Sequence, residues 1–218
     1  KTTDYIKFNT PDVVKATAEE IKKVLLESGL WVALKQRPYG IVANPADEPR
    51  AIFVSAFDSA QLAPDYNFTL KGEAANLQVA VDVLNKLTKG GVFVGLNAKE
   101  AATSPFNHLK NVKLYGFSGA HPAGNVGVQI NNIAPVNKGE VVWTIDPMFM
   151  VAVGKLFTKG IYDVTRTIAV AGNRVEKPCY VTCVPGTQIK DLDFLTSKKE
   201  VEIFDQETGR RYISGNVL

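Results

Sequence analysis

Three glycines and a histidine distinguish the stretch FSGAHPAGNVGVQINNIAPV, residues 117–136, because both residue types can take part in chemistry. A glycine-rich turn that leads into a helix presents free backbone N–H groups to a phosphate. Gly119, Gly124 and Gly127 follow the spacing G-x-x-x-x-G-x-x-G, which matches neither the dinucleotide fingerprint nor a Walker A loop. By themselves these glycines therefore favour a tight strand-to-helix turn over a phosphate loop.

His121 is the candidate general base in the same stretch. A catalytic histidine needs a partner, and the nearby Ser118 lacks the G-x-S-x-G setting of a serine nucleophile. The other histidine, His108, lies in the polar segment SPFNHLKN and is expected to be exposed. The sequence thus assigns no catalytic residue, and we interpret His121 as a loop histidine.

Two further segments carry charge where a ligand could meet it. The segment KQRPYGIVANP places Lys35 and Arg37 beside Tyr39, which would suit an anion, although a solvated loop is the favoured interpretation. Asp58 follows a predicted strand at its carboxyl end, where open α/β folds place their ligands. Asp58 could contact a ligand or cap a turn, and the sequence leaves both alternatives open.

The two cysteines, Cys179 and Cys183, lie in PCYVTCVPG. Residues four apart in a strand lie on one face but about 13 Å apart, which is beyond disulfide reach. A metal site would need further Cys or His nearby, and the chain has only two histidines. We therefore expect two buried thiols and no bound metal.

Composition excludes two classes of partner. The net charge is only +3, and no cluster of Lys and Arg with interleaved aromatics is present, so nucleic acid is set aside. The longest apolar runs, AIFVSAF and FMVAVG, are far shorter than the roughly 20 residues of a membrane span. We expect a globular protein with no membrane span of its own.

Helical and strand patterns alternate over roughly residues 15–158. Amphipathic helices are predicted over 17–31, 73–91 and 146–160. The first has a capping box at Thr17 and Glu20, and the last begins with Asp146 and Pro147. Short apolar strands are predicted at 51–57, 92–96, 111–117 and 141–145. This alternation predicts an α/β fold with a parallel sheet covered on both faces.

The pattern changes after Gly160. Two strands, a short helix with Thr187 as N-cap and a hairpin turning at ETG are predicted in the C-terminal part. We therefore place a domain boundary near residue 160, before a small β-rich module with one helix.

Several segments, taken in order, resemble a known family. They are LLESGLWVALKQRPYG, GAHPAGNVGVQINNIAPV, VVWTI, MVAVGKLFTKGIYDVTRTIAVAG and the closing RYISGNVL. Together they resemble the A subunit of the Na+-translocating NADH:quinone reductases, from about residue 10 to the C-terminus. That subunit is similar in turn to the flavoprotein subunit of respiratory complex I and to the C subunit of the Rnf complex.

The resemblance implies a fold, a set of partners and a location. It implies a Rossmann-like open sandwich over residues 1–159 and a soluble-ligand-binding β-grasp domain over residues 160–218. It also implies that the chain is a central fragment, because full-length relatives carry an N-terminal biotinyl-lipoyl-like domain and a C-terminal extension. The partners would be the other subunits of a complex on the cytoplasmic side of the bacterial inner membrane.

The departures from the complex I flavoprotein concern its flavin site. Its R-G-R-G-G-A-G-F-P loop is replaced by WVALKQRPYGIVANP, in which only Gly40 is a glycine. Bulky residues such as Arg37 would prevent the close backbone approach that glycines permit. Its acidic segments are lost as well. Asn125 and Val126 stand where the flavoprotein has acidic residues, and Asp58 is the one acid retained. Two cysteines also cannot hold an iron–sulfur cluster.

We therefore expect a docking and structural subunit that has no redox cofactor and borders a quinone site. NADH and flavins would be used by the whole complex. A quinone pocket needs apolar walls and one or two hydrogen-bond donors. The residues nominated as quinone-proximal are Phe117, His121, Trp143 and Tyr39.

Two alternatives remain open at the level of sequence. The chain could be a flavin- or nicotinamide-dependent dehydrogenase with phosphates on Gly124 and Gly127. It could also be a binding module that holds a small ligand in the β-grasp domain around Gly186.

Overall fold

The computed structural model describes residues 5–173, 175, 177–188, 191, 204–205, 210–211 and 213–215. The chain divides into two compact units. Unit 1 comprises Lys1–Ser59 and Asp65–Asp163, and unit 2 comprises Ala60–Pro64 and Val164–Leu218. The main division follows Asp163, and the short segment Ala60–Pro64 belongs to unit 2 although unit 1 residues flank it in the sequence.

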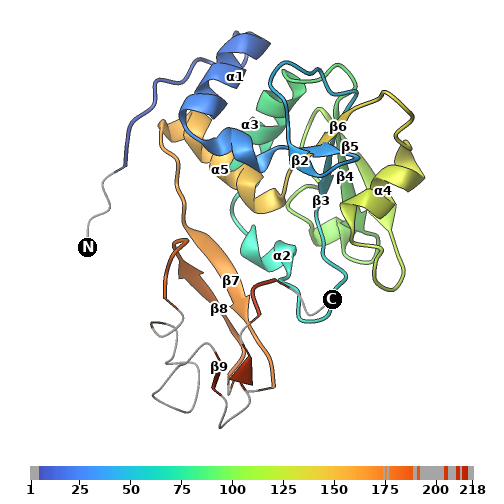
Figure 1. The fold of residues 1–218 in the computed structure, drawn as a ribbon, viewed down its shortest axis with the longest axis vertical. Coiled ribbons are helices and arrows are strands. Elements are labelled where there is room, and N and C mark those ends of the chain that lie inside the picture. Colours follow the sequence, from blue (N-terminus) through green and yellow to red (C-terminus); the bar gives the residue numbers. More distant parts are fainter. Residues whose placement is uncertain are drawn as a thin grey trace. The chain divides into compact units, whose positions relative to one another are not determined.

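Unit 1 contains a six-stranded sheet in the order β2-β1-β6-β3-β4-β5 (Figure 1). Its strands are β1 (Lys35–Arg37), β2 (Ile41–Val42), β3 (Ile52–Ser55), β4 (Val92–Asn97), β5 (Val112–Phe117) and β6 (Val142–Thr144). Strands β6, β3, β4 and β5 are mutually parallel, as predicted. The prediction of a wholly parallel sheet is wrong at one edge, where β1 and β2 run antiparallel.

The strand order reverses beside β3. From β3 the chain moves outward through β4 to β5, and then returns across the sheet to place β6 on the other side of β3. Such a reversal opens a crevice outside the carboxyl ends of the two flanking strands. In this fold the two strands are β3 and β6, which end at Ser55 and Thr144.

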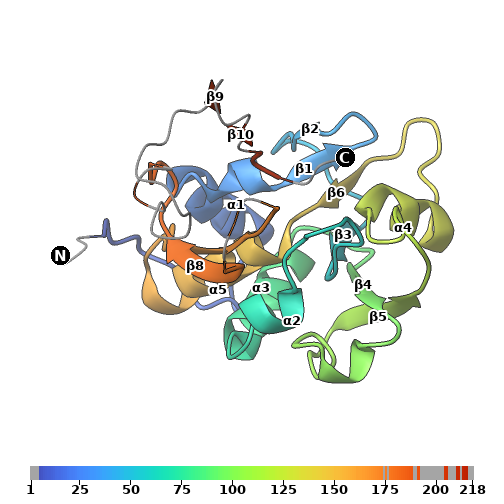
Figure 2. The same cartoon turned by 90° about the horizontal axis from the view of Figure 1, so that it is seen from below.

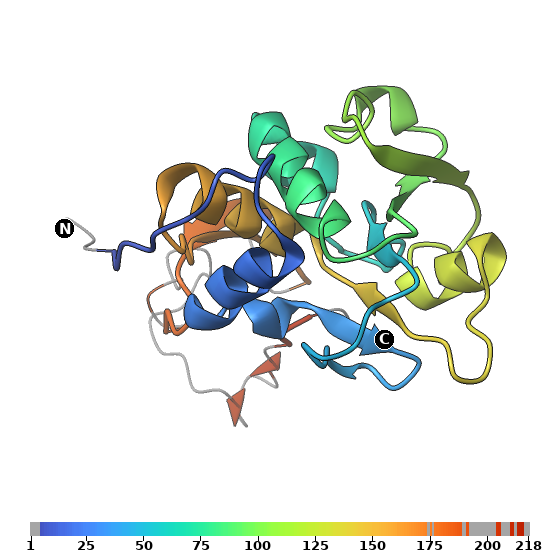
Figure 3. The ribbon, with the colours of Figure 1, turned by 90° about the horizontal axis from the view of Figure 1, so that it is seen from above.

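Helices cover both faces of the sheet. They are α1 (Ala18–Glu27), α2 (Tyr66–Thr69), α3 (Ala74–Asn85), α4 (Val126–Ile133) and α5 (Pro147–Lys159), with 3-10 turns η1 (Leu30–Ala33) and η2 (Ala101–Thr103). Helices α1, α3 and α5 share one buried cluster with the sheet, whereas α4 packs in a second cluster on the opposite face. Figures 2 and 3 show α4 separated from the other long helices by the sheet.

The predicted helix signals act as expected. Thr17 and Glu20 form a reciprocal capping box, with Thr17 N–H donating to Glu20 Oε2 at 2.8 Å. Asp146 caps α5 by accepting from Met148 N–H at 2.8 Å, and Pro147 occupies the first turn. Gly160 ends α5 at φ 66°, where glycine is favoured.

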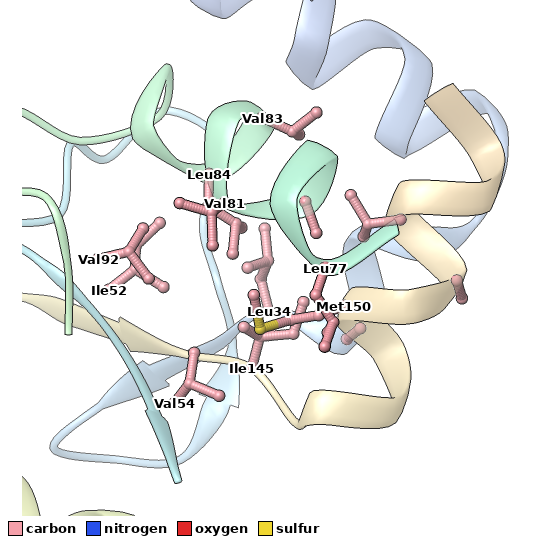
Figure 4. Close-up of a cluster of buried hydrophobic side chains, with 14 of the residues drawn as sticks. Leu34, Ile52, Val54, Leu77, Val81, Val83, Leu84, Val92, Ile145 and Met150 are labelled. Carbon is pink, nitrogen blue, oxygen red and sulfur yellow. The ribbon is translucent and has the colours of Figure 1, made fainter. Parts of the chain in front are cut away.

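The larger core lies between the sheet and helices α3 and α5. Figure 4 shows Leu77, Val81 and Leu84 of α3 gathered with sheet and α5 side chains. Ile52 and Met150 belong to the same cluster and are fully buried. This packing fixes the backbone at the ends of β3 and β6, so the crevice between them has a rigid floor.

The segment interpreted as a solvated loop forms a hairpin instead. Strands β1 and β2 lie within KQRPYGIVANP and pair with each other, and β1 also pairs with β6, with Gln36 opposite Trp143. Gln36 is buried, and its polar atoms are satisfied: the amide nitrogen donates to Asp47 Oδ2 at 3.0 Å, and the amide oxygen accepts from Asn44 N–H. The polar composition of this segment does not predict a strand, but a strand forms because the buried Gln36 amide finds partners nearby.

Unit 2 contains two antiparallel pairs. Strand β7 (Arg166–Val170) pairs with β8 (Cys179–Cys183), and β9 (Phe204–Asp205) pairs with β10 (Arg210–Arg211) on either side of the predicted ETG turn. The helix predicted beyond Thr187 falls outside the described residues, apart from a few positions. The cysteines are free, but they are half-exposed rather than buried, which corrects that expectation.

Candidate functional site

A cleft of about 620 Å³ opens at the point where the strand order reverses. Its floor is formed by the ends of β3 and β6, including Ser55 and Thr144. Its walls come from β1, the first turn of α4, the start of α5 and Tyr66 of α2. All of these elements belong to unit 1, and we call this space the switch-point cleft. Its volume lies in the range typical of small-molecule sites.

One wall of the cleft is basic. Lys35 and Arg37 of β1 lie opposite Thr144 and Val142 of β6 in the strand register. Cross-strand partners point to the same face of a sheet, and Val142 packs against α4. The two basic side chains therefore lie on the α4 face. The Arg37 Nε is buried and has no hydrogen-bond partner in the part of the chain that the structure describes.

The opposite wall is the amino end of α4. Asn125 is the N-cap residue, but no side chain caps the helix, so its first N–H groups are left for another acceptor. Gly124 and Gly127 both line the cleft here, whereas Gly119 belongs to the preceding turn and has φ 140°. A side chain at Gly124 would collide with Ser59, and one at Gly127 would meet nothing within 4 Å.

The third side of the cleft is acidic. Asp146 accepts from the Tyr66 hydroxyl at 3.1 Å while it caps α5. Burial, followed by the charge and hydrogen bond of Asp146 and the charge of Asp58, raises the pKa of the Tyr66 hydroxyl far above its usual range. Asp58 lines this side, as the strand-end argument suggested. Tyr66 therefore stays protonated and can act only as a neutral hydroxyl.

His121 has a partner that the sequence did not reveal. Its Nδ1 lies 3.0 Å from Ser59 Oγ, and the same oxygen accepts from Gly124 N–H at 2.8 Å. Ser118 is not part of this network. Ser59 thus ties the histidine loop to the segment that follows β3, and His121 does not join the lining of the cleft.

A buried glutamine completes this attachment. Gln129 of α4 is 1% exposed and donates to Ser55 Oγ at 2.8 Å and to the Ala123 carbonyl at 3.2 Å. Ser55 Oγ lies 2.8 Å from the Gly124 carbonyl. These bonds hold the first turn of α4 against β3. No sequence motif marks Gln129, because its side-chain partner Ser55 is distant in the chain.

The four residues nominated as quinone-proximal do not share a site. Trp143 is fully buried in the core, where it packs edge-on against Trp31 at 5.4 Å. Tyr39 is 81% exposed at the tip of the β1–β2 hairpin. Phe117 ends β5, at the far edge of the sheet from that hairpin. None of these three residues, nor His121, is among the residues that line the cleft.

Other chemistry at the described residues is limited. His108 is exposed, as expected. No group of three or more His, Cys, Asp or Glu side chains suited to a metal occurs among the residues that the structure describes. Within the same residues no helix is long and apolar enough to cross a membrane. The cleft, with its basic wall, acidic side and apolar residues, is therefore a candidate binding site.

Comparison with known proteins identifies the family. The family model described as NqrA second alpha/beta domain matches residues 16–162, more than half of the chain. The chain belongs to the NqrA family. The curated relatives it matches are named as the A subunit of Na(+)-translocating NADH-quinone reductase. The protein from Cellvibrio japonicus is 36% identical over 192 residues, which cover 87% of this chain and 42% of the relative.

Two further relatives agree with this assignment. The Pseudomonas aeruginosa protein is 35% identical over 215 residues, 99% of this chain and 46% of its own length. The Neisseria gonorrhoeae protein is 34% identical over 206 residues, 94% of this chain and 44% of the relative. The chain thus spans less than half the length of these NqrA relatives.

Solved structures show where this fold recurs. The crystal structure of an NAD+-reducing NiFe hydrogenase in the air-oxidized state is similar to this chain, with a TM-score of 0.60. The match covers 86% of this chain and 40% of the hydrogenase chain. The hydrogen-reduced state gives a TM-score of 0.55 over 84% of this chain and 39% of that chain. Both are only 12% identical in sequence, so the likeness concerns the fold.

Proposed function

We propose that this chain works as part of the A subunit of a Na+-translocating NADH:quinone reductase, as a docking and structural module without a redox cofactor of its own. The family membership supports this role, because the relatives carry that name over the matched region. The partners would be the other subunits of the complex, on the cytoplasmic side of the bacterial inner membrane. Unit 1 would be the Rossmann-like domain, and the β7–β8 and β9–β10 pairs would belong to a β-grasp domain.

The replaced flavin loop supports the absence of a flavin. Where the related flavoproteins have a run of glycines, this chain forms the β1–β2 hairpin, and Arg37 lines the cleft. A side chain of that size occupies the space through which a glycine backbone could approach a ring system.

We place the quinone contribution in the switch-point cleft. Phe57, Val128 and Phe149 supply apolar walls, and Lys35 supplies a donor for a carbonyl oxygen. This combination is the observation that carries the proposal. The quinone site thus differs from the four residues nominated by sequence, of which Trp143 is shielded by the core.

Photo-crosslinking with a quinone analogue in the intact complex tests this placement. Labelled peptides should include 55–58 or 125–128, and Phe149→Ala should reduce labelling there. Val32→Ala is a suitable control, because Val32 is 53% exposed and lies outside the cleft. Labels confined to other subunits would remove the quinone role from this chain.

A second candidate function is binding of flavin or nicotinamide nucleotide in the same cleft. It is favoured by one observation, the position of Gly124 and Gly127 at the uncapped amino end of α4. Titration of the purified chain with FMN and NADH tests it. Micromolar binding of either would favour the dehydrogenase, and a colourless protein that binds neither would exclude it.

A further inference from the structure

Charge is segregated within the switch-point cleft. The carboxylates of Asp58 and Asp146 lie on the Tyr66 side, where both oxygens of Asp146 already accept hydrogen bonds. The basic wall faces α4 across β6, because Lys35 and Arg37 share a sheet face with Val142. The charges of Lys35, Arg37, Asp58 and Asp146 sum to zero, but the side of the cleft nearest α4 is positive.

Arg37 has unmet hydrogen-bonding capacity in this position. Its Nε is buried without a partner among the described residues. A buried donor without an acceptor is costly, and a planar guanidinium is well shaped for an oxyanion. Lys35, on the same face two residues away, supplies a second positive charge.

The amino end of α4 contributes a third set of donors. The helix has no side-chain cap and no acidic residue in its first turn, so its positive dipole end is not neutralised locally. By contrast α5, which starts in the same cleft, is capped by Asp146. The two helix starts in the cleft therefore differ, and only α4 is open to an anion.

We propose that this end of the cleft binds the phosphate group of a phosphate monoester, held by Arg37, Lys35 and the first N–H groups of α4. Its organic part would lie against Phe57 and Phe149. A phosphate can satisfy all three donor sets at once, which a single carbonyl oxygen cannot. The inference goes beyond the proposed quinone role, because it names a different ligand; Lys35, Phe57 and Phe149 would serve both, so the two ligands would compete for the cleft.

Calorimetric titration of the 218-residue chain at constant ionic strength tests the proposal, with inorganic phosphate and phenyl phosphate as probes. Phenyl phosphate should bind more tightly than inorganic phosphate, because its ring can use the apolar walls. Arg37→Gln should weaken phenyl phosphate binding by about 10- to 100-fold. Lys35→Gln should weaken it less, because Lys35 is exposed. Lys99→Gln removes one exposed charge outside the cleft and should have no effect.

Gly127 provides a test that separates binding from folding. Its site is open and its φ is not in the left-handed region, so Gly127→Asp should stabilise α4 through the helix dipole while repelling phosphate. Gly127→Ala is the matched steric control, because it adds a side chain at the same position without a charge. Loss of binding only in the Asp variant, with an unchanged or higher melting temperature, supports the site.

Three outcomes would overturn the proposal. They are no phenyl phosphate binding by the unaltered chain, equal binding by the Arg37→Gln variant, and equal binding by the Gly127→Asp variant. Phenyl phosphate binding without FMN or NADH binding would support this site while excluding the dehydrogenase alternative. Quinone crosslinking has no bearing on these results.

Discussion

Gly124 joins the His121 loop to the end of β3, and its replacement by Ala perturbs that junction directly. A Cβ at this position would lie 2.5 Å from the Ser59 backbone nitrogen, 2.9 Å from Ser59 Oγ and 3.0 Å from the Phe57 carbonyl oxygen. Two of these three atoms are backbone atoms, so no side-chain rotation relieves the contact. The loop must move away from β3.

Two effects lower the free energy of unfolding of the Gly124→Ala variant. Forcing an extra carbon into a packed site costs about 1–3 kcal/mol. The movement also weakens the 2.8 Å bond from Gly124 N–H to Ser59 Oγ, which adds about 1 kcal/mol. We expect Gly124→Ala to lower the free energy of unfolding by roughly 2–4 kcal/mol. Gly127→Ala should raise it by about 0.5–1 kcal/mol, since that site is open.

Urea denaturation followed by tryptophan fluorescence measures both variants. Trp31 and Trp143 are the only tryptophans in the chain, and both lie in unit 1, so the signal reports the unit that contains the junction. With a slope of about 2 kcal/mol per molar urea, Gly124→Ala should lower the midpoint by roughly 1–2 M. Equal midpoints for the two alanine variants would refute the reasoning, because Gly124→Ala should lower the midpoint and Gly127→Ala should raise it.

Three other substitutions test separate parts of unit 1 by the same assay. Gly154→Ala should destabilise by about 3 kcal/mol, because its Cβ would collide with the Asn76 backbone where α3 and α5 cross; a change below about 1 kcal/mol would contradict that packing. Thr17→Ala should cost about 1 kcal/mol through loss of the capping box, and an unchanged midpoint would mean that the box adds nothing. Tyr66→Phe should cost about 1 kcal/mol at neutral pH through loss of the bond to Asp146. Because the folded state raises the pKa of Tyr66, stability should fall as pH rises above about 10, where the unfolded chain ionises first. Tyr66→Phe should make that fall shallower. A pH dependence identical to that of the unaltered chain would argue against a raised Tyr66 pKa.

Local signals made much of unit 1 predictable. Helices α1 and α5 begin at the predicted residues because a capping box and an Asp-Pro start are contained within a few residues of sequence. Strands β3 and β4 are short apolar runs buried by helices, and their pattern is equally local. These features need no knowledge of distant contacts.

The β1–β2 hairpin was missed because its stability is not local. Gln36 is tolerated inside the sheet since Asn44 and Asp47 satisfy its amide, and β1 is held by its register with β6, more than a hundred residues later. A three-residue strand with polar side chains shows no alternation that a sequence pattern could reveal. The charged residues of this segment were noticed, but their position in the cleft was not predictable.

The candidate site was predictable only in part for the same reason. The spacing of Gly124 and Gly127 and the strand-end position of Asp58 led to lining residues of the cleft. Ser59 and Tyr66 were missed, because each acts through a partner over sixty residues away. Trp143 is one of the residues nominated as quinone-proximal, but its place in a central strand buries it completely.

The proposed phosphate site would recognise its ligand differently from a glycine loop. A glycine loop recognises a ring system through backbone approach, which requires the absence of side chains. The β1–β2 hairpin instead brings the Lys35 and Arg37 side chains to the same edge of the sheet, opposite an uncapped helix start. Recognition would then depend on charge and on hydrogen bonds from side chains. Binding in this cleft should accordingly depend strongly on salt concentration, whereas binding through apolar contacts alone should not.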